Sequence, residues 1–317
     1  MATQIWTGAG DGITWSSTAN WASASVPATG DDVYFINGSS QITAGLSQSA
    51  VTLNSLNVYP GFTGAIGVVG PTGASLAIGI ITLVMLGSSG SNSGNNSGVF
   101  GSAGITLFKW TPGSVAFTAT IAGTGASTDT FGSAVQIYGG TSGSNLYVNG
   151  GTVDVAMVPG QTATLALVDV SGSGTVNCGP GVTCPAYNQN GSQSSLLVSS
   201  ATTTLTSIAG NLATLGTGLM ATMIVGGTGT LNHRAASGNS ITTLTVNTNG
   251  SANFSNNPAG LLIANPIQMY RGASLTAFSK TQLQLAGPAS IEVVAEGCGV
   301  GDLTLAFGTL GQTITIA

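Results

Sequence analysis

Charged side chains are scarce in this sequence. Lys and Arg number 4 and Asp and Glu number 9 in 317 residues, which makes 4 % charged residues, whereas an average soluble domain has about 25 %. Such a surface lacks the charges that normally keep strand edges and apolar patches from associating. We therefore expect a permanent homo-oligomer, and we favour a homotrimer because side-by-side packing would bury one apolar face of each subunit.

The scarcity of basic residues also excludes several partners. The net charge is −5 at pH 7, so the chain has no basic field that could neutralise phosphates, and we expect no nucleic acid and no anionic membrane as partner. The longest apolar run, at 76–86, has 11 residues, and a membrane-spanning helix needs about 20. We predict a buried strand there instead.

Secretion and cysteine signals are equally weak. Met1 is followed by polar residues and Trp6, without the basic and apolar regions of a signal peptide, so we expect synthesis in the cytoplasm without ordinary secretion. Three cysteines make neither a disulfide framework nor a zinc site. Cys178 and Cys184 could be bridged in an oxidising medium, but thiols are the favoured state for them and for Cys298.

The abundant residues favour β-structure. Gly numbers 49, and long stretches rich in Thr, Val and Ser lack the Glu, Lys, Arg and Gln that fill exposed helix faces. The sequence therefore predicts an all-β fold.

A short pattern recurs between Leu146 and Phe278: an apolar anchor, several small polar residues and a second apolar residue. The intervals between anchors are 22, 28, 27, 21 and 23 residues. They predict a β-solenoid, or β-helix-like stack of coils about 4.8 Å apart with the anchors in an internal column, although a Gly/Ser/Thr-rich chain can also look repetitive by chance. The anchors are Val148, Val170, Val198, Val225, Val246 and Met269, and the second apolar residues are Val153, Val176, Leu205, Leu231, Phe254 and Leu275.

Three of the four tryptophans lie near the start of the chain, at Trp6, Trp15 and Trp21. They supply large apolar area in a segment that is otherwise small and polar. We interpret residues 1–45 as a cap or attachment module that covers the end of the coil stack. The alternative is a carbohydrate platform of exposed aromatic rings.

The same segment carries a longer motif. Its residues are Trp6, Gly8, Trp15, Asn20, Trp21, Val26, Pro27, Gly30, Asp31, Asp32 and Val33, continuing into 40–67. This motif is similar to that of virion proteins of tailed phages that carry autotransporter-like β-solenoid repeats. The resemblance covers about the first 70 residues and implies a non-enzymatic shell or fibre component that leaves the cell by lysis.

The chain after the cap divides into three predicted segments. Residues 46–140 form the first β-rich coils, with a low-complexity loop at 87–98. Residues 141–285 form the solenoid coils. Residues 286–317 form a C-terminal β-module that is closer to a β-meander, with strands at 290–297, 302–308 and 312–317, and it is a second candidate cap or oligomer contact.

No set of residues predicts catalysis. Paired carboxylates would be needed for glycoside hydrolysis, but Asp154 and Asp169 lie at different offsets from their anchors and Asp31 and Asp32 point to opposite faces of an extended chain. Glu292 and Glu296 would meet on a helix, whereas their segment reads as a strand. The only histidine, His233, stands beside Arg234, and we interpret the two as a surface turn. We expect no catalytic, cofactor-binding or metal-binding residue.

These features favour a phage virion structural protein on the virion surface. The leading prediction is a capsid decoration or cement protein that contacts the major capsid protein or other virion proteins. The alternatives are a tail fibre or receptor-binding protein, a glycan depolymerase of the tailspike type and a bacterial adhesin. Host-surface glycans are the expected partners of the first two alternatives.

Overall fold

The computed structural model describes residues 1–86, 104–198, 204–215, 220–234, 240–255, 262–265, 267–277, 284–285, 291–293 and 304–307. The all-β prediction is confirmed: this part of the chain contains 27 strands, one 3-10 turn at Thr18–Asn20 and no α-helix. The predicted low-complexity loop at 87–98 lies outside the described residues.

The chain forms two compact units. The first comprises Met1–Ala166 and Gly172–Gly181, and the second comprises Leu167–Ser171 and Val182–Ala317. Strand β12 (Leu167–Cys178) contributes residues to both. The boundaries of these two units differ from those of the four predicted segments. The Trp-rich segment, for example, belongs to the same unit as the strands that follow it.

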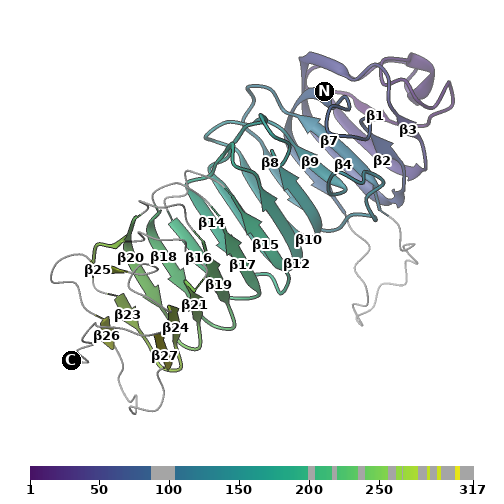
Figure 1. Cartoon of the computed structure of the whole chain (residues 1–317). Coiled ribbons are helices and arrows are strands. Elements are labelled where there is room, and N and C mark those ends of the chain that lie inside the picture. Colours follow the sequence, from purple (N-terminus) through teal and green to yellow (C-terminus); the bar gives the residue numbers. More distant parts are fainter. Residues whose placement is uncertain are drawn as a thin grey trace. The chain divides into compact units, whose positions relative to one another are not determined.

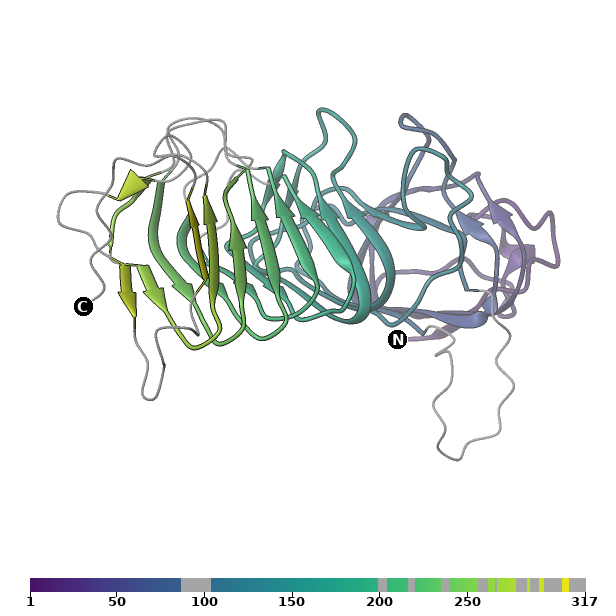
Figure 2. The same ribbon diagram turned by 60° about the horizontal axis from the view of Figure 1, so that its bottom comes forward.

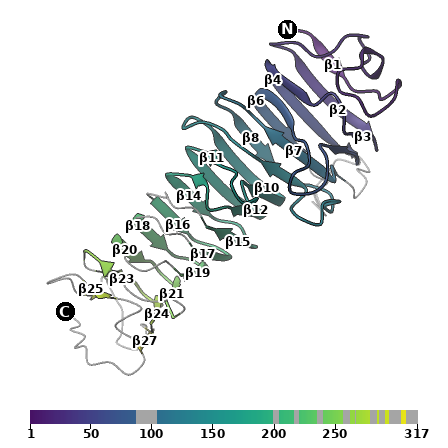
Figure 3. The ribbon, with the colours of Figure 1, turned by 45° about the horizontal axis from the view of Figure 1, so that its top comes forward.

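The first unit contains two series of parallel strands (Figures 1 and 3). In one series β2 pairs with β4, β4 with β6, β6 with β8 and β8 with β10. In the other, β3, β5, β7, β9 and β10 pair in that order. The strands are β1 (Thr3–Ile5), β2 (Asp32–Gly38), β3 (Gln41–Ile42), β4 (Ser47–Phe62), β5 (Ala65–Ile66), β6 (Leu76–Met85), β7 (Leu107–Thr111), β8 (Thr118–Ile121), β9 (Val135–Ile137), β10 (Asn145–Val155) and β11 (Ala163–Thr164).

The core of the first unit is an apolar column along its first series of strands. Five buried residues occupy equivalent register positions on successive parallel strands, and each therefore packs on the next at the strand spacing of about 4.8 Å. The predicted anchor Val148 is one of them. The column consists of Phe35, Val58, Met85, Ile121 and Val148.

The second unit also contains two parallel series (Figure 2). One runs through β14, β16, β18, β20, β23 and β26, and the other through β15, β17, β19, β21, β24 and β27. The strands are β13 (Val182–Thr183), β14 (Ala186–Gln189), β15 (Ser194–Leu197), β16 (Thr204–Ser207), β17 (Asn211–Thr214), β18 (Met220–Val225), β19 (Thr230–His233), β20 (Ser240–Val246), β21 (Ser251–Asn253), β22 (Leu262–Ile263), β23 (Ile267–Met269), β24 (Ser274–Ala277), β25 (Gln284–Leu285), β26 (Ile291–Val293) and β27 (Thr304–Phe307).

The register aligns most predicted anchors of this unit and leaves one outside the column. Val170, Gln189, Ser207 and Val225 follow one another in register, and Val225 continues the column to Val246 and Met269. The prediction of Val198 was wrong, because it follows the end of β15 in the other series. Two strands of this series, β14 and β16, therefore lie between Val170 and Val225, where the sequence spacing suggested one. Apolar periodicity missed them because their buried positions hold Gln and Ser.

The second apolar residues do not all lie in one series. Leu231 is in register with Leu212 and Ala252, as a second-series column requires. Leu205 lies instead on the first-series strand β16, and Phe254 lies two residues beyond the column position of Ala252.

The C-terminal strands do not form the predicted β-meander. A meander needs antiparallel neighbours, whereas β26 pairs parallel with β23 and β27 pairs parallel with β24. The described strands of this segment therefore continue the parallel series. The third predicted strand, 312–317, lies outside the described residues.

Close packing of successive levels requires glycine at two positions, Gly172 within β12 and Gly227 in the turn after β18. Gly172 has φ +54°, and a β-carbon there would lie 2.5 Å from the carbonyl oxygen of Asn149. Gly227 has φ +57°, and its β-carbon would lie 2.5 Å from the carbonyl oxygen of Ile208. Both the positive φ and the contact exclude other residues.

Candidate functional site

The N-terminal tryptophans form a buried aromatic cluster. Trp6, Trp15 and Trp21 are 3 %, 0 % and 3 % exposed. Trp21 packs edge-on against both others, with ring centroids 5.0 Å from Trp6 and 5.1 Å from Trp15, and Phe35 of the apolar column lies 5.8 Å from Trp15. The rings therefore seal the end of the core and present no platform on which a sugar could stack.

Asn20 organises the loop that carries these tryptophans. Its side chain is completely buried: Oδ1 accepts hydrogen bonds from the Gly10 and Gly12 amides, and Nδ2 donates to the Asp11 carboxylate and the Thr14 carbonyl. These four bonds satisfy the whole amide group. The sequence analysis named Asn20 as a motif residue but gave it no structural role.

The loop also covers the outer strand of the first unit. The amide of Ala22 donates to the Ile5 carbonyl of β1, and Thr7 donates to the Asn20 carbonyl. Trp6 and Trp21 form the antiparallel bridge next to them. Because β1 is paired to β2 on its other side, the loop occupies backbone groups that would otherwise template association.

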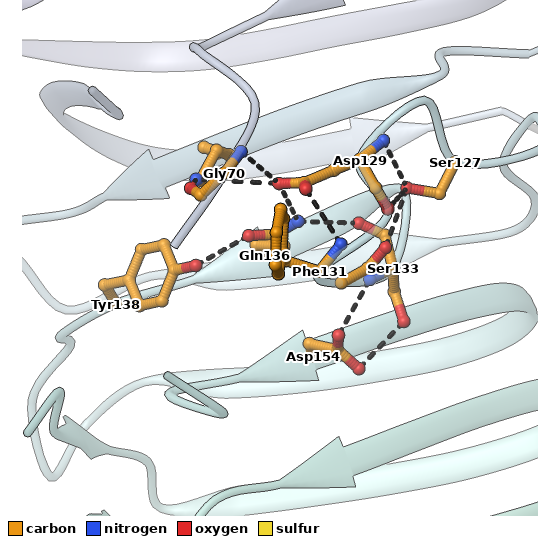
Figure 4. Close-up of polar contacts among 10 residues, drawn as sticks. Gly70, Ser127, Asp129, Phe131, Ser133, Gln136, Tyr138 and Asp154 are labelled. Carbon is orange, nitrogen blue, oxygen red and sulfur yellow. Dashed lines mark hydrogen bonds and ion pairs between the residues drawn. The ribbon is translucent and has the colours of Figure 1, made fainter. Parts of the chain in front are cut away.

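A buried ion pair lies under two loops of the first unit, and Figure 4 shows its acid, Asp129, with the residues around it. Lys109 Nζ on β7 is 3.7 Å from Asp129 Oδ2, and both side chains are 1 % exposed. Lys109 also donates to the Gly70 carbonyl. Asp129 accepts hydrogen bonds from the Gly70 amide, the Phe131 amide and Gln136 Nε2 at 3.0–3.1 Å. The pair joins the loop before β6 to the loop before β9.

Burial and hydrogen bonding set the charge states of this pair. Burial lowers the pKa of Lys109, and the Asp129 carboxylate opposes that effect. Burial alone would raise the pKa of Asp129, but its three donors and the Lys109 charge hold the pKa below the usual range. Tyr138, whose hydroxyl donates to Gln136, has a pKa raised to about 12 by burial and by Asp129 and Asp154.

The carboxylates singled out in the sequence have structural partners. Asp154 accepts hydrogen bonds from the Ser133 amide and hydroxyl (Figure 4) and from Asn177, and Asp169 accepts one from Asn188. Asp154 is in register with Gln136 and Asp169 with Asn188, so neither pairs with another carboxylate in its series.

Asp31 and Asp32 also have structural partners. Asp31 accepts hydrogen bonds from the amides of Ala2 and Ala28 and from the Gln4 side chain. Asp32 accepts hydrogen bonds from the side chains of Asn54 and Ser55. Glu292 is in register with Gln268, and Glu296 lies outside the described residues.

His233 is not in a surface turn as predicted, because it is the last residue of β19 and only 2 % exposed. Its Nδ1 is 2.6 Å from the hydroxyl of Thr214, its register partner, and its ring packs edge-on against Phe254 at 5.5 Å. Nε2 has no hydrogen-bond partner within the described structure. Burial lowers the pKa of His233 to about 4, so the ring is neutral at pH 7.

This buried histidine should make the second unit acid-sensitive. The unfolded chain binds a proton at a pKa near 6.5 and the folded chain only at about 4, so stability is complete above pH 6.5 and falls as pH drops to 4. The expected loss is about 3 kcal/mol. Urea titrations followed by circular dichroism at pH 4.5 and 7.5 measure it.

The variant His233→Leu should lose most of this pH dependence. Trp fluorescence is an internal control, because all four tryptophans lie in the first unit. If the stability of the variant falls between pH 7.5 and 4.5 as much as that of the wild type, groups other than His233 cause the acid sensitivity.

Two buried polar residues interrupt the apolar column of the second unit. Gln189 and Ser207 are register partners and both are fully buried. Gln189 Nε2 donates to the carbonyls of Gly191 and Gln193, while Gln189 Oε1 and the Ser207 hydroxyl lack partners within the described structure. Polar groups of this kind favour one register, because a shifted strand would leave more of them unsatisfied.

The two described cysteines are buried thiols, as predicted, and neither is disulfide-bonded. Burial raises the pKa of the Cys184 thiol to about 12, and its sulfur donates to the Ala186 carbonyl at 3.0 Å. A thiol of this kind is unreactive at neutral pH. Cys298 lies outside the described residues.

The second unit contains a pocket of about 410 Å³ lined by Ala213, Leu215, Asn232, His233 and Arg234. Among the described residues, no group of three or more His, Cys, Asp or Glu side chains could hold a metal ion. The same part of the chain contains no helix long and apolar enough to cross a bilayer.

Comparison with known proteins gives no further assignment. No family model, no curated protein sequence and no solved structure matches this chain. The function must therefore be argued from its own residues.

Proposed function

We propose that this chain is a β-solenoid virion structural protein of a tailed phage that decorates or cements the capsid surface. The observation that carries the proposal is the N-terminal motif, whose residues form a sealed end to a parallel stack. Trp6, Trp15 and Trp21 close the core, and Asn20 and Asp31 hold the surrounding loop by hydrogen bonds. These are the positions at which the sequence resembles phage virion proteins.

The solenoid part of the proposal rests on the strand series. Two parallel series advance together through the second unit, so that one strand of each series and the turn between them make one level. Repetition of such levels with a shared internal column is the arrangement of a β-solenoid coil.

A structural role, not a catalytic one, agrees with the use of the charged groups. Asp31, Asp129 and Asp154 accept backbone amides, and His233 is neutral inside the core. A catalytic acid or base needs access to substrate, and these groups are used to fix loops.

The proposed partners follow from the charge distribution. A surface with few charges suits a homo-oligomer, for which we propose a trimer, and contacts with the major capsid protein or other virion proteins. The alternative of a tail fibre or receptor-binding protein is favoured by the pocket beside Asn232 and Arg234, whose amide and guanidinium groups could bind a glycan of the host surface.

Mass spectrometry of purified virions tests the proposal. The protein should be present at a copy number comparable with shell proteins, and electron microscopy should place it on the capsid. Its location on the tail would favour the receptor-binding alternative. Its absence from virions would refute both.

A further inference from the structure

Lys109 is a buried nucleophile beside a buried carboxyl group. Its Nζ lies 3.7 Å from Asp129 Oδ2, and both side chains are 1 % exposed. An amine and a carboxyl group in contact are the two components of an amide bond. In water such a pair stays ionic, because both charges are well hydrated. Inside the first unit that hydration is lost, and joining the two groups would remove both buried charges.

The lysine amine is fixed beside the carboxyl group. Lys109 lies on β7, and its Nζ also donates a hydrogen bond to the Gly70 carbonyl. Groups positioned in this way react as if they were highly concentrated, provided that the reacting atoms come within about 3–3.5 Å of each other. The carbon to be attacked, Asp129 Cγ, is bonded to Oδ2, so Nζ is already close to that contact.

Burial also shifts the charge states of the two groups. It lowers the pKa of Lys109, which favours the neutral amine that can attack a carbonyl carbon. Burial would raise the pKa of Asp129, but its hydrogen-bond donors and Lys109 outweigh that effect and lower it. The pair therefore begins as ammonium and carboxylate, and one proton must first pass from Nζ to Oδ2.

Three donors are placed to stabilise the charge that develops on the carboxyl oxygens during attack (Figure 4). The Phe131 amide donates to Asp129 Oδ1 at 3.0 Å, and the Gly70 amide and Gln136 Nε2 donate to Oδ2, both at 3.1 Å. Attack of the amine on Cγ gives a tetrahedral intermediate with a negative oxygen. Fixed N–H donors in a buried site stabilise such an oxygen.

We propose that Lys109 and Asp129 condense to an intramolecular isopeptide bond that joins β7 covalently to the loop before β9. The lone pair of Nζ forms the new bond to Cγ, and the bond between Cγ and Oδ2 breaks. Two of the three ammonium protons pass to Oδ2, which leaves as water, and the third stays on the amide nitrogen. Oδ1 remains as the amide oxygen and keeps its hydrogen bond from the Phe131 amide. One positive and one negative charge disappear, and no other reactant is needed.

The bond would brace the first unit at the loop before β9. Local opening of this loop could no longer carry Asp129 away from β7, because the two are joined covalently. A disulfide constrains the unfolded chain in the same way, but an amide is not broken by reducing agents. The inference concerns this unit alone and stands or falls independently of the proposed function.

Mass spectrometry of the denatured wild-type chain tests the proposal. The chain should be lighter than its unmodified mass by one water molecule. Lys109→Arg is the matched control, because a guanidinium keeps the positive charge but does not condense with a carboxyl group, and this variant should lose no water. A wild type found only at its full mass overturns the proposal. The same spectrum gives the fraction of unreacted chain, which is the form that keeps the ion pair.

Trypsin digestion after denaturation locates the bond. The chain contains only 4 Lys and Arg residues, and trypsin cannot cut after a lysine whose amine is acylated. The wild type should therefore give residues 1–234 as one fragment, whereas Lys109→Arg and Asp129→Ala should both be cut at position 109. A wild type that is one water lighter and is still cut after Lys109 has lost that water elsewhere, for example at Asp11 and Gly12, and overturns the proposal. Protection of Lys109 that persists in Asp129→Ala overturns it as well.

Discussion

Replacing Lys109 with Met should destabilise the first unit by about 3 kcal/mol. Removing one partner of a buried ion pair leaves an uncompensated charge, which costs about 3–5 kcal/mol. The lower end applies here because the Asp129 carboxylate keeps its three hydrogen-bond donors, from Gly70, Phe131 and Gln136. Urea denaturation followed by Trp fluorescence measures the loss, since Trp110 lies next to Lys109 on β7.

The double variant Lys109→Met/Asp129→Asn is the matched control. Its neutral amide removes the buried charge and keeps one acceptor oxygen for the Gly70 amide and Gln136, but it offers no acceptor to the Phe131 amide, so part of the lost stability should return. If the double variant is as unstable as the single one, packing of the lysine stem, and not the unpaired charge, is responsible.

Replacing Trp15 with Ala should cost about 3–5 kcal/mol, the range for truncation of a buried aromatic side chain. Trp15 is 0 % exposed and contacts the rings of Trp21 and Phe35. Its amide also donates to the Ala44 carbonyl, so collapse of the cluster would loosen the loop that covers β1. We expect a lower midpoint of thermal unfolding together with aggregation, measured by calorimetry and light scattering.

Trp15→Phe separates ring packing from hydrogen bonding. The indole nitrogen of Trp15 has no hydrogen-bond partner within the described structure, whereas that of Trp21 donates to the Trp15 carbonyl at 2.8 Å. Trp15→Phe should therefore recover most of the stability, and Trp21→Phe should recover less. Equal behaviour of the two Phe variants would contradict this assignment.

Local composition determined the all-β fold. A chain rich in Gly, Thr, Val and Ser has few of the long polar side chains that favour an exposed helix face, whereas its Thr and Val residues favour strands. The apolar run at 76–86 forms β6, and Val148, Val170, Val225, Val246 and Met269 occupy internal positions in the parallel series. These features follow from neighbours in sequence, which is why pattern alone found them.

Only the tertiary structure decided which polar groups lie inside. Gln189, Ser207 and His233 are buried because the strand pairing places them on the inner face, and their polarity hid them from a search for apolar residues. The Lys109–Asp129 pair joins residues that are distant in the chain. The direction of the C-terminal strands likewise depends on their partners, β23 and β24. Composition constrains local conformation, whereas register and burial are set by contacts between strands that the sequence keeps apart.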